Sequence, residues 1–110
     1  MLSVTILGNN SAVPAYNRHP TSQVVQTMEH TFLLDCGEGT QMQMNSFKIK
    51  KSKINHIFIS HLHGDHYFGL IGLITSFGLN HRTNELHIHA PEQLKKIIEI
   101  QLNISNVALP

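Results

Sequence analysis

The strongest constraint on the fold of this chain is a short central segment that holds four metal-binding side chains. They are His61, His63, Asp65 and His66. A strand-like apolar run at residues 54–59 precedes them. In an extended backbone, side chains two residues apart point to the same side. His61 and His63 are therefore expected to leave the strand side by side and to bind one ion together.

The second pair of candidate ligands follows a turn. Gly64 lets the chain change direction without steric penalty, and we expect Asp65 and His66 to open a helix from which they reach a second ion. Imidazole and carboxylate donors suit borderline ions such as Zn²⁺, with Mn²⁺ or Fe as substitutes. Two ions about 3.5–4 Å apart can activate a water and hold both oxygens of a displaced ester. The alternative is chance surface polarity, but four unpaired donors between apolar flanks would be costly.

Composition limits the class of protein. The 110 residues are enough for one domain or part of one, and only 14% of them are charged, against about 25% in typical globular proteins. So few charges fit a partial domain or an oligomer. The net charge of +1 neither favours nor excludes nucleic acid as a partner.

The compartment is also constrained by the sequence. The single cysteine, Cys36, cannot form an internal disulfide, which favours a reducing environment. Residues 1–7 lack the basic region and long apolar core of a signal peptide. The longest apolar stretch, residues 67–74, is far shorter than the ~20 residues that a membrane span needs. We expect a cytoplasmic protein with no membrane partner.

Apolar patterning predicts strands that first follow one another and then alternate with helices. We expect strands at residues 2–7, 22–28, 31–35, 54–59 and 85–90, and helices at residues 40–47, 66–79 and 92–102. The second and third strands should form a hairpin around residues 29–30, and Thr40 is typical of a helix N-cap. This order predicts an α/β fold, that is, an α+β layer structure with a mixed sheet.

Three segments together resemble the ribonuclease Z family, the metallo-β-lactamase-fold endonucleases that mature transfer-RNA 3′ ends. They are residues 7–18, with Leu-Gly, Ser-Ala-Val-Pro and Arg; residues 34–41, Leu-Asp-Cys-Gly-Glu-Gly-Thr-Gln; and residues 60–73, which include the histidines and a Gly-Leu-x-Gly-Leu tail. The resemblance extends over residues 2–91. The histidine segment alone marks only the superfamily, whereas the other two signatures indicate this member.

The resemblance implies a partial domain. Residues 1–110 would form a single partial metallo-β-lactamase domain, the N-terminal half of an αββα sandwich without its C-terminal half. Family members have further metal ligands beyond this length. We therefore expect the 110-residue chain alone to bind metal weakly and to be inactive. It should also associate through apolar faces of the 54–59 strand and the 67–77 helix.

The resemblance also implies a function. It predicts a zinc-dependent endoribonuclease that removes the 3′ trailer from precursor tRNA, as a cytoplasmic homodimer with two Zn²⁺ ions per complete site. His61 and His63 would hold one ion, and Asp65 and His66 the other. A hydroxide bridging the ions would attack the phosphodiester, and Asp65 resembles the catalytic residue that orients this water and accepts its proton. The family's first loop places the cleavage site, which makes Arg18 and His19 weak candidates for RNA binding.

Alternatives remain for both function and individual residues. The chain could belong to another hydrolase of this fold, such as a phosphodiesterase or an arylsulfatase-like enzyme, or be an inactive half-domain that assembles with a second chain. Asp35 and Glu38 either orient the metal histidines or are solvated turn residues. The lysines at positions 48, 50, 51 and 53 either contact phosphates or form a solvated connector. His87 and His89 fit the polar face of a strand, with metal binding as the weaker alternative. Cys36 fits a small buried hydrophobe better than a nucleophile.

Overall fold

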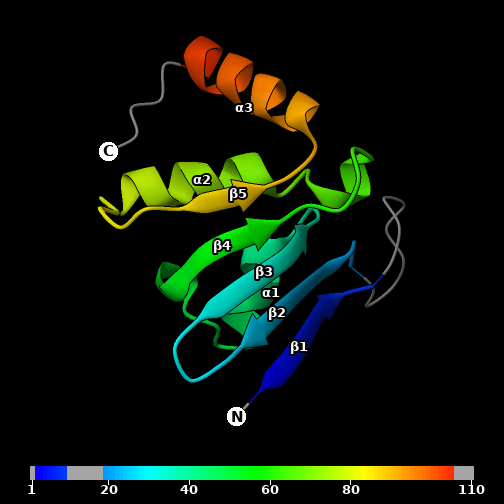
Figure 1. The fold of residues 1–110 in the computed structure, drawn as a ribbon, viewed down its shortest axis with the longest axis vertical. Coiled ribbons are helices and arrows are strands. Elements are labelled where there is room, and N and C mark those ends of the chain that lie inside the picture. The colour runs from blue at the N-terminus through cyan, green and yellow to red at the C-terminus, as the bar shows by residue number, and fades with distance from the viewer. Residues whose placement is uncertain (1, 10–18, 106–110) are drawn as a thin grey trace.

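One mixed sheet dominates the structure. The computed structural model describes residues 2–9 and 19–105 (Figure 1). Within these residues, the sheet has five strands in the order β1-β2-β3-β4-β5. The elements are β1 (Ser3–Gly8), β2 (Ser22–Gln26), β3 (Thr31–Cys36), α1 (Thr40–Ser46), η1 (Lys51–Lys53), β4 (Ile54–Phe58), η2 (Gly64–His66), α2 (Leu70–Leu79), β5 (His87–His89) and α3 (Glu92–Ser105).

The direction of each strand pair follows from its connection. β2 pairs antiparallel with both β1 and β3. The β2–β3 loop is tight: the Thr27 hydroxyl oxygen accepts the His30 backbone N–H at 3.0 Å. β4 pairs parallel with both β3 and β5, and parallel pairs require a crossover. α1 lies in the first crossover and α2 in the second. The prediction of a mixed α/β sheet is confirmed.

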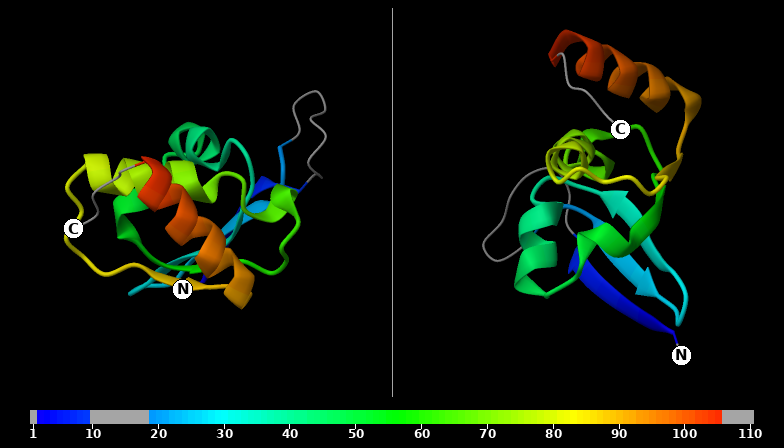
Figure 2. Two further views of the ribbon diagram at one scale, coloured as in Figure 1. Left: turned by 90° about the horizontal axis from the view of Figure 1, so that it is seen from above. Right: turned by 90° about the vertical axis from the view of Figure 1, so that its left-hand side faces the viewer.

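The hydrophobic core lies between the sheet and its helices. Figure 2 shows α1 and α2 on the same side of the sheet. The central strands direct Val24, Leu33 and Ile57 toward this side, and all three side chains are fully buried. The helices and the ends of the strands supply most of the remaining buried apolar residues: Leu7, Met44, Ile54, Ile59, Leu70, Leu73, Ile74, Phe77 and Leu94. Burying such side chains is the dominant favourable term in folding.

The opposite face of the sheet carries two cross-strand rows. Directly paired residues share a face, so strand register defines each row. The first is Val4, Val25, Phe32, His56 and His87, and the second is Ile6, Gln23, Leu34, Phe58 and His89. In both rows the residue on β1 is aliphatic and the residue on β5 is a histidine. Val4 is 56% exposed and Ile6 is 55% exposed, so this face is an uncovered apolar surface.

The expectation that the 67–77 helix would leave an apolar face uncovered is wrong. Leu70, Leu73 and Phe77 of α2 are buried in the core, because the helix packs on the sheet. In β4, Ile54 and Ile57 are buried and only Phe58 is exposed among the apolar residues. Among the described residues, the far face of the sheet is therefore left uncovered, whereas the side of α2 that packs on the sheet is buried.

Several predicted boundaries are also wrong. The helix expected from residue 66 begins at Leu70, and Asp65 and His66 lie in the short 3₁₀ turn η2 instead. The backbone N–H of Gly69 donates to the Cys36 carbonyl at 2.9 Å. This bond holds the segment before α2 against the end of β3, so the α-helix begins only after Gly69. α1 has Gly39, at φ 83°, as its N-cap in place of Thr40. β5 is shorter than predicted, and α3 is longer.

Candidate metal centre

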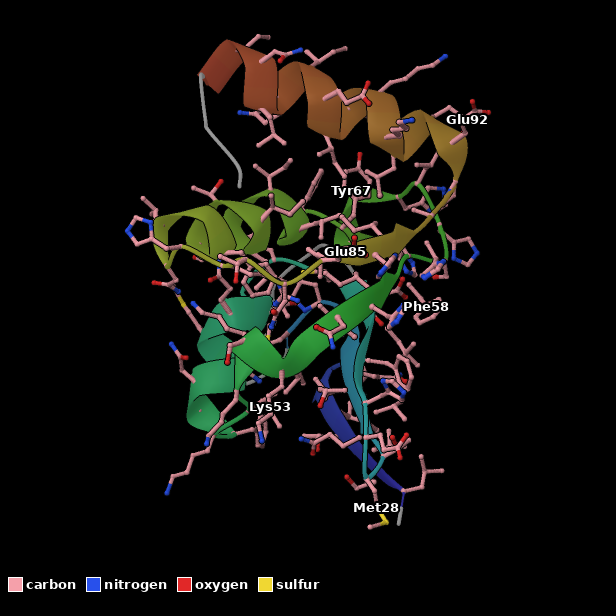
Figure 3. The ribbon with its side chains drawn as sticks, turned by 60° about the vertical axis from the view of Figure 1, so that its left-hand side comes forward. Met28, Lys53, Phe58, Tyr67, Glu85 and Glu92 are labelled. Carbon is pink, nitrogen blue, oxygen red and sulfur yellow. The ribbon has the colours of Figure 1, made fainter. Side chains whose placement is uncertain are left out.

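The candidate ligands lie at one edge of the sheet. β3 and β4 are parallel, so their carboxyl ends meet there, where ligands bind in open α/β sheets. Asp35 is near the end of β3, and Ser60 follows β4. In Figure 3, Phe58 marks this end of β4, which lies far from the hairpin tip at Met28. Parallel pairing therefore joins two of the three sequence segments that carried the resemblance.

Asp35 fixes the orientation of one candidate ligand. Its Oδ2 atom accepts a hydrogen bond from His66 Nδ1 at 2.8 Å. Its Oδ1 atom accepts the Ser60 backbone N–H at 2.8 Å, and the Ser60 hydroxyl donates to the same carboxylate. With its proton held at Nδ1, His66 keeps the Nε2 lone pair available for a metal ion. These contacts agree with an orienting partner, one of the two interpretations offered by the sequence.

The backbone of Asp35 is unusual as well. Its φ is 61°, in the left-handed region that Asp tolerates better than most side chains. Such a conformation persists only where the surroundings enforce it, and it is often found at functional sites. Here it lies at the end of β3, where the carboxylate contacts both Ser60 and His66. Glu38 is solvent-exposed, which agrees with a solvated turn residue.

Asp65 and His66 can share one ion. The atoms His66 Nε2 and Asp65 Oδ2 lie 3.6 Å apart. Zinc binds imidazole nitrogen and carboxylate oxygen at about 2.0–2.2 Å, so two donors at this separation fit the coordination sphere of a single ion. Their side chains are about one-fifth exposed, 20% for His66 and 21% for Asp65. The donor set therefore fits a borderline divalent metal.

His61 and His63 form a second pair. Both are exposed, and their ring centroids lie 6.1 Å apart with 18° between the ring planes. The His61 ring also lies 4.8 Å from the His66 ring. Within residues 2–9 and 19–105, no group of three or more His, Cys, Asp or Glu side chains is placed to hold an ion by itself. In the described residues the candidate donors lie in two pairs, His61 with His63 and Asp65 with His66. Their assignment as metal ligands stays a prediction.

Glycines allow the ligand loop to approach the turn after β3. A Cβ atom on Gly37 would lie 2.6 Å from the Asp65 carbonyl oxygen, and one on Gly69 would meet the Gly37 carbonyl. Backbones this close exclude any larger residue at either position. The Asp-Cys-Gly-Glu-Gly-Thr segment and the histidine segment are thus two halves of one packed unit, which holds Asp35 beside His66.

Cys36 is a core residue. Its side chain is fully buried. The pKa of the thiol is raised to about 12, chiefly by burial; a hydrogen bond with the Thr40 side chain opposes this shift, and the Asp35 carboxylate adds to it. The predicted role as a small buried hydrophobe is confirmed, because a thiol with this pKa is a poor nucleophile.

The other candidates from the sequence lie outside the site. Lys48, Lys50 and Lys53 are exposed, and Lys51 Nζ donates to Gln41 Oε1 at 3.3 Å; this agrees with a solvated connector. His87 and His89 are exposed on β5, as predicted. Arg18 falls outside the described residues. His19 is half-buried beside the turn, with Nδ1 3.8 Å from the position of a Cβ on Gly39.

Comparison with known proteins places the chain in a family. The profile of the family described as Anti-Pycsar protein Apyc1 matches residues 2–105. The chain belongs to this family. Ribonuclease Z of Bacteroides fragilis is 55% identical over 98 residues, which make up 89% of this chain and 32% of that protein. The structure of human tRNase Z, short form, matches with a TM-score of 0.90 and 37% identity, covering 99% of this chain and 42% of that one.

The fold is that of the metallo-β-lactamases. The metallo-beta-lactamase fold protein YhfI from Bacillus subtilis matches with a TM-score of 0.71 at 22% identity, over 86% of this chain and 42% of that one. The resemblance to ribonuclease Z is confirmed over most of the chain. This chain spans about a third of the length of the curated relatives it matches. None of the helices in the described ranges is long and apolar enough to cross a membrane.

Proposed function

We propose that this chain is the N-terminal part of a metal-dependent endoribonuclease that removes 3′ trailers from precursor tRNA. Residues 1–110 would form a single partial domain, whose catalytic centre is completed by further ligands. The observation that carries the proposal is the contact of Asp35 with His66, which leaves His66 Nε2 beside the Asp65 carboxylate. The identity of 55% to a protein named ribonuclease Z supports it.

Each candidate residue has a distinct task in this proposal. His61 and His63 would hold one Zn²⁺ ion, and Asp65 and His66 a second. Such ions supply an activated water and stabilise charge on a phosphodiester. The Asp65 carboxylate orients the attacking water and accepts its proton. Asp35 keeps the His66 imidazole in the orientation that leaves its free nitrogen at the site.

The proposal also covers the substrate, the oligomeric state and the cellular compartment. Precursor tRNA is the substrate, and the loop that contains Arg18 and His19 helps to seat it. The complete enzyme acts as a homodimer in the cytoplasm. If His19 seats the RNA, then His19→Ala should shift the cleavage position on tRNA while leaving hydrolysis of a small diester unchanged. Equal losses on both substrates would assign this loop a structural role.

A second candidate is a hydrolase for other phosphodiesters. The matched family profile is compatible with it, because its description names a protein other than ribonuclease Z. The two candidates share the metal centre and differ in the substrate that reaches it. Precursor tRNA and a small chromogenic phosphodiester, assayed with the same enzyme, distinguish them.

A chimera provides the decisive assay. This chain would replace the matching 98-residue segment of the B. fragilis ribonuclease Z, to which it is 55% identical. We expect the chimera to cleave precursor tRNA, and we expect Asp65→Ala to remove nearly all turnover while circular dichroism stays unchanged. The matched control is Glu38→Gln, an exposed carboxylate on the neighbouring turn. Turnover of Asp65→Ala within a few-fold of the parent would refute the role of Asp65, and activity on the small diester alone would favour the second candidate.

A further inference from the structure

A second group of histidines lies outside the candidate centre. Of the nine histidines in the chain, four gather on the uncovered face of the sheet: His30, His56, His87 and His89. His87 and His89 are two residues apart on β5 and therefore share a face. Strand register places His56 of β4 directly beside His87. The His56 ring stacks at 4.9 Å on His87 and at 5.5 Å on His89.

Two of these rings bring nitrogen atoms together. His56 Nδ1 lies 3.2 Å from His89 Nε2. When both rings are neutral, one nitrogen donates its hydrogen to the lone pair of the other. The alternative tautomers, with the hydrogens on His56 Nε2 and His89 Nδ1, leave two lone pairs at this position. Uncharged imidazole lone pairs are the commonest metal donors in proteins.

The spacing matches one metal ion. Zinc–imidazole bonds are about 2.0–2.1 Å long, so nitrogens separated by this distance subtend an angle of about 100° at a shared ion, near the tetrahedral value. Both rings must turn so that their lone pairs point toward the ion and no longer toward each other. Zn²⁺, Ni²⁺ and Cu²⁺ all accept imidazole ligands.

We propose that His56 and His89 form a two-imidazole clip for a borderline divalent transition-metal ion, separate from the candidate centre at residues 61–66. Water fills the remaining coordination positions. No third protein ligand is assigned, because in the part of the chain that the structure describes no three His, Cys, Asp or Glu side chains are placed to hold an ion together. His87 packs beside the clip, and its Nε2 lies 3.4 Å from Glu85 Oε2.

Neighbouring aromatic rings hold the clip in place. Phe58 stacks on His89 with ring centroids 4.5 Å apart and 12° between the planes. The ring centroid of Phe32, on the neighbouring strand β3, lies 5.7 Å from that of His56. Rings restrained in this way lose less conformational entropy when they bind an ion.

The clip borders the hollow at the sheet edge. His89 and Phe58 line the same shallow cavity as Asp35 and Ser60. The His89 backbone carbonyl accepts the N–H of Ile59, one residue before Ser60. The proposed ion would therefore be held in part by a residue that lines this cavity. Its binding can be detected independently of any catalytic activity.

The test uses the 110-residue chain with His61→Ala and His63→Ala, which remove one candidate ligand pair. Cu²⁺ is added below one equivalent, and the assigned imidazole signals are followed by NMR. We expect the paramagnetic ion to broaden His56 and His89 first, and His81 only at excess metal. In Zn²⁺ calorimetry, His56→Gln and His89→Gln should each weaken this site at least tenfold.

The control is His81→Asn, which alters an exposed histidine on the α2–β5 connection. Its φ of 57° is one that Asn tolerates, so the variant keeps the backbone and should retain full affinity at the clip. Broadening confined to Asp65 and His66 would overturn the proposal. So would Gln variants whose affinity stays within twofold of the parent. Because the NMR experiment needs no change at the clip, it decides the question even if a Gln variant misfolds.

Discussion

The Asp35 carboxylate and the His66 imidazole are joined by a 2.8 Å hydrogen bond, although 31 residues separate them in the chain. The bond connects the end of β3 to the turn η2, and Ser60 donates to the same carboxylate from the end of β4. It therefore links the parallel strand pair to the loop that carries the candidate ligands. The geometry of the candidate centre depends on this pair more directly than on any single ligand.

Removing the charge of Asp35 should weaken metal binding. Asp35→Asn in the chimeric enzyme keeps a side chain that tolerates the φ of 61°, but it no longer stabilises the proton on His66 Nδ1. Loss of such an orienting partner typically costs about 10–100-fold in metal affinity, and we expect a decrease in this range by zinc titration. Glu38→Gln is the matched control, since it neutralises an exposed carboxylate three residues away. Equal affinities for the two variants would contradict the assigned role.

The Cys36 thiol should be unreactive in the folded protein. Only the thiolate is a good nucleophile, and with a pKa of about 12 almost none is present at pH 8. We expect a chromogenic disulfide reagent to modify less than a tenth of the protein in an hour. The same sample in concentrated denaturant should react stoichiometrically. Rapid modification without denaturant would mean that the turn after β3 opens readily.

The sequence predicted the order of the elements, which depends on local pattern. It also singled out the four candidate ligands by their spacing, and their role as ligands stays a prediction. The consecutive apolar residues 32–34 of β3 and the His-x-His-x-Asp-His spacing are visible without a structure. The start of α2 was not predictable in this way, since the tie from Gly69 to Cys36 joins distant segments. The pairing of His56 with His89 was missed for the same reason, because it depends on the register between β4 and β5.

Acidification should destabilise the uncovered face of the sheet. The pKa of His56 is lowered by partial burial and by His87, His89 and His30, so its folded-state pKa lies below that of the unfolded chain. Protonation is then more favourable in the unfolded state, and stability falls as the pH drops below about 6.5, the ordinary histidine value. The Glu85 carboxylate, 3.4 Å from His87, is the neighbouring charge that opposes this effect.

Urea unfolding at several pH values measures this dependence. We expect the midpoint for the unaltered chain to decrease between pH 7.5 and pH 5.5, and the decrease to be smaller in His56→Gln. His81→Asn, which is remote from the cluster, should follow the unaltered chain. A midpoint in His56→Gln that decreases as steeply as in the parent would assign the pH dependence to other groups.

The uncovered face should also drive association of the 110-residue chain. Val4 and Ile6 are more than half exposed on the edge strand β1, and Phe58 continues the second cross-strand row on β4. Exposed apolar patches of several hundred Å² mark interaction surfaces, and an unprotected edge strand adds unpaired backbone groups. We expect sedimentation analysis to detect dimers or larger species at micromolar concentration.

Ile6→Lys should shift the chain toward monomer, because a charge on this face must be desolvated on contact. Met42→Lys provides the control, since Met42 is 76% exposed on α1, on the helical side of the sheet. If the unaltered chain is a monodisperse monomer, the uncovered face does not drive association.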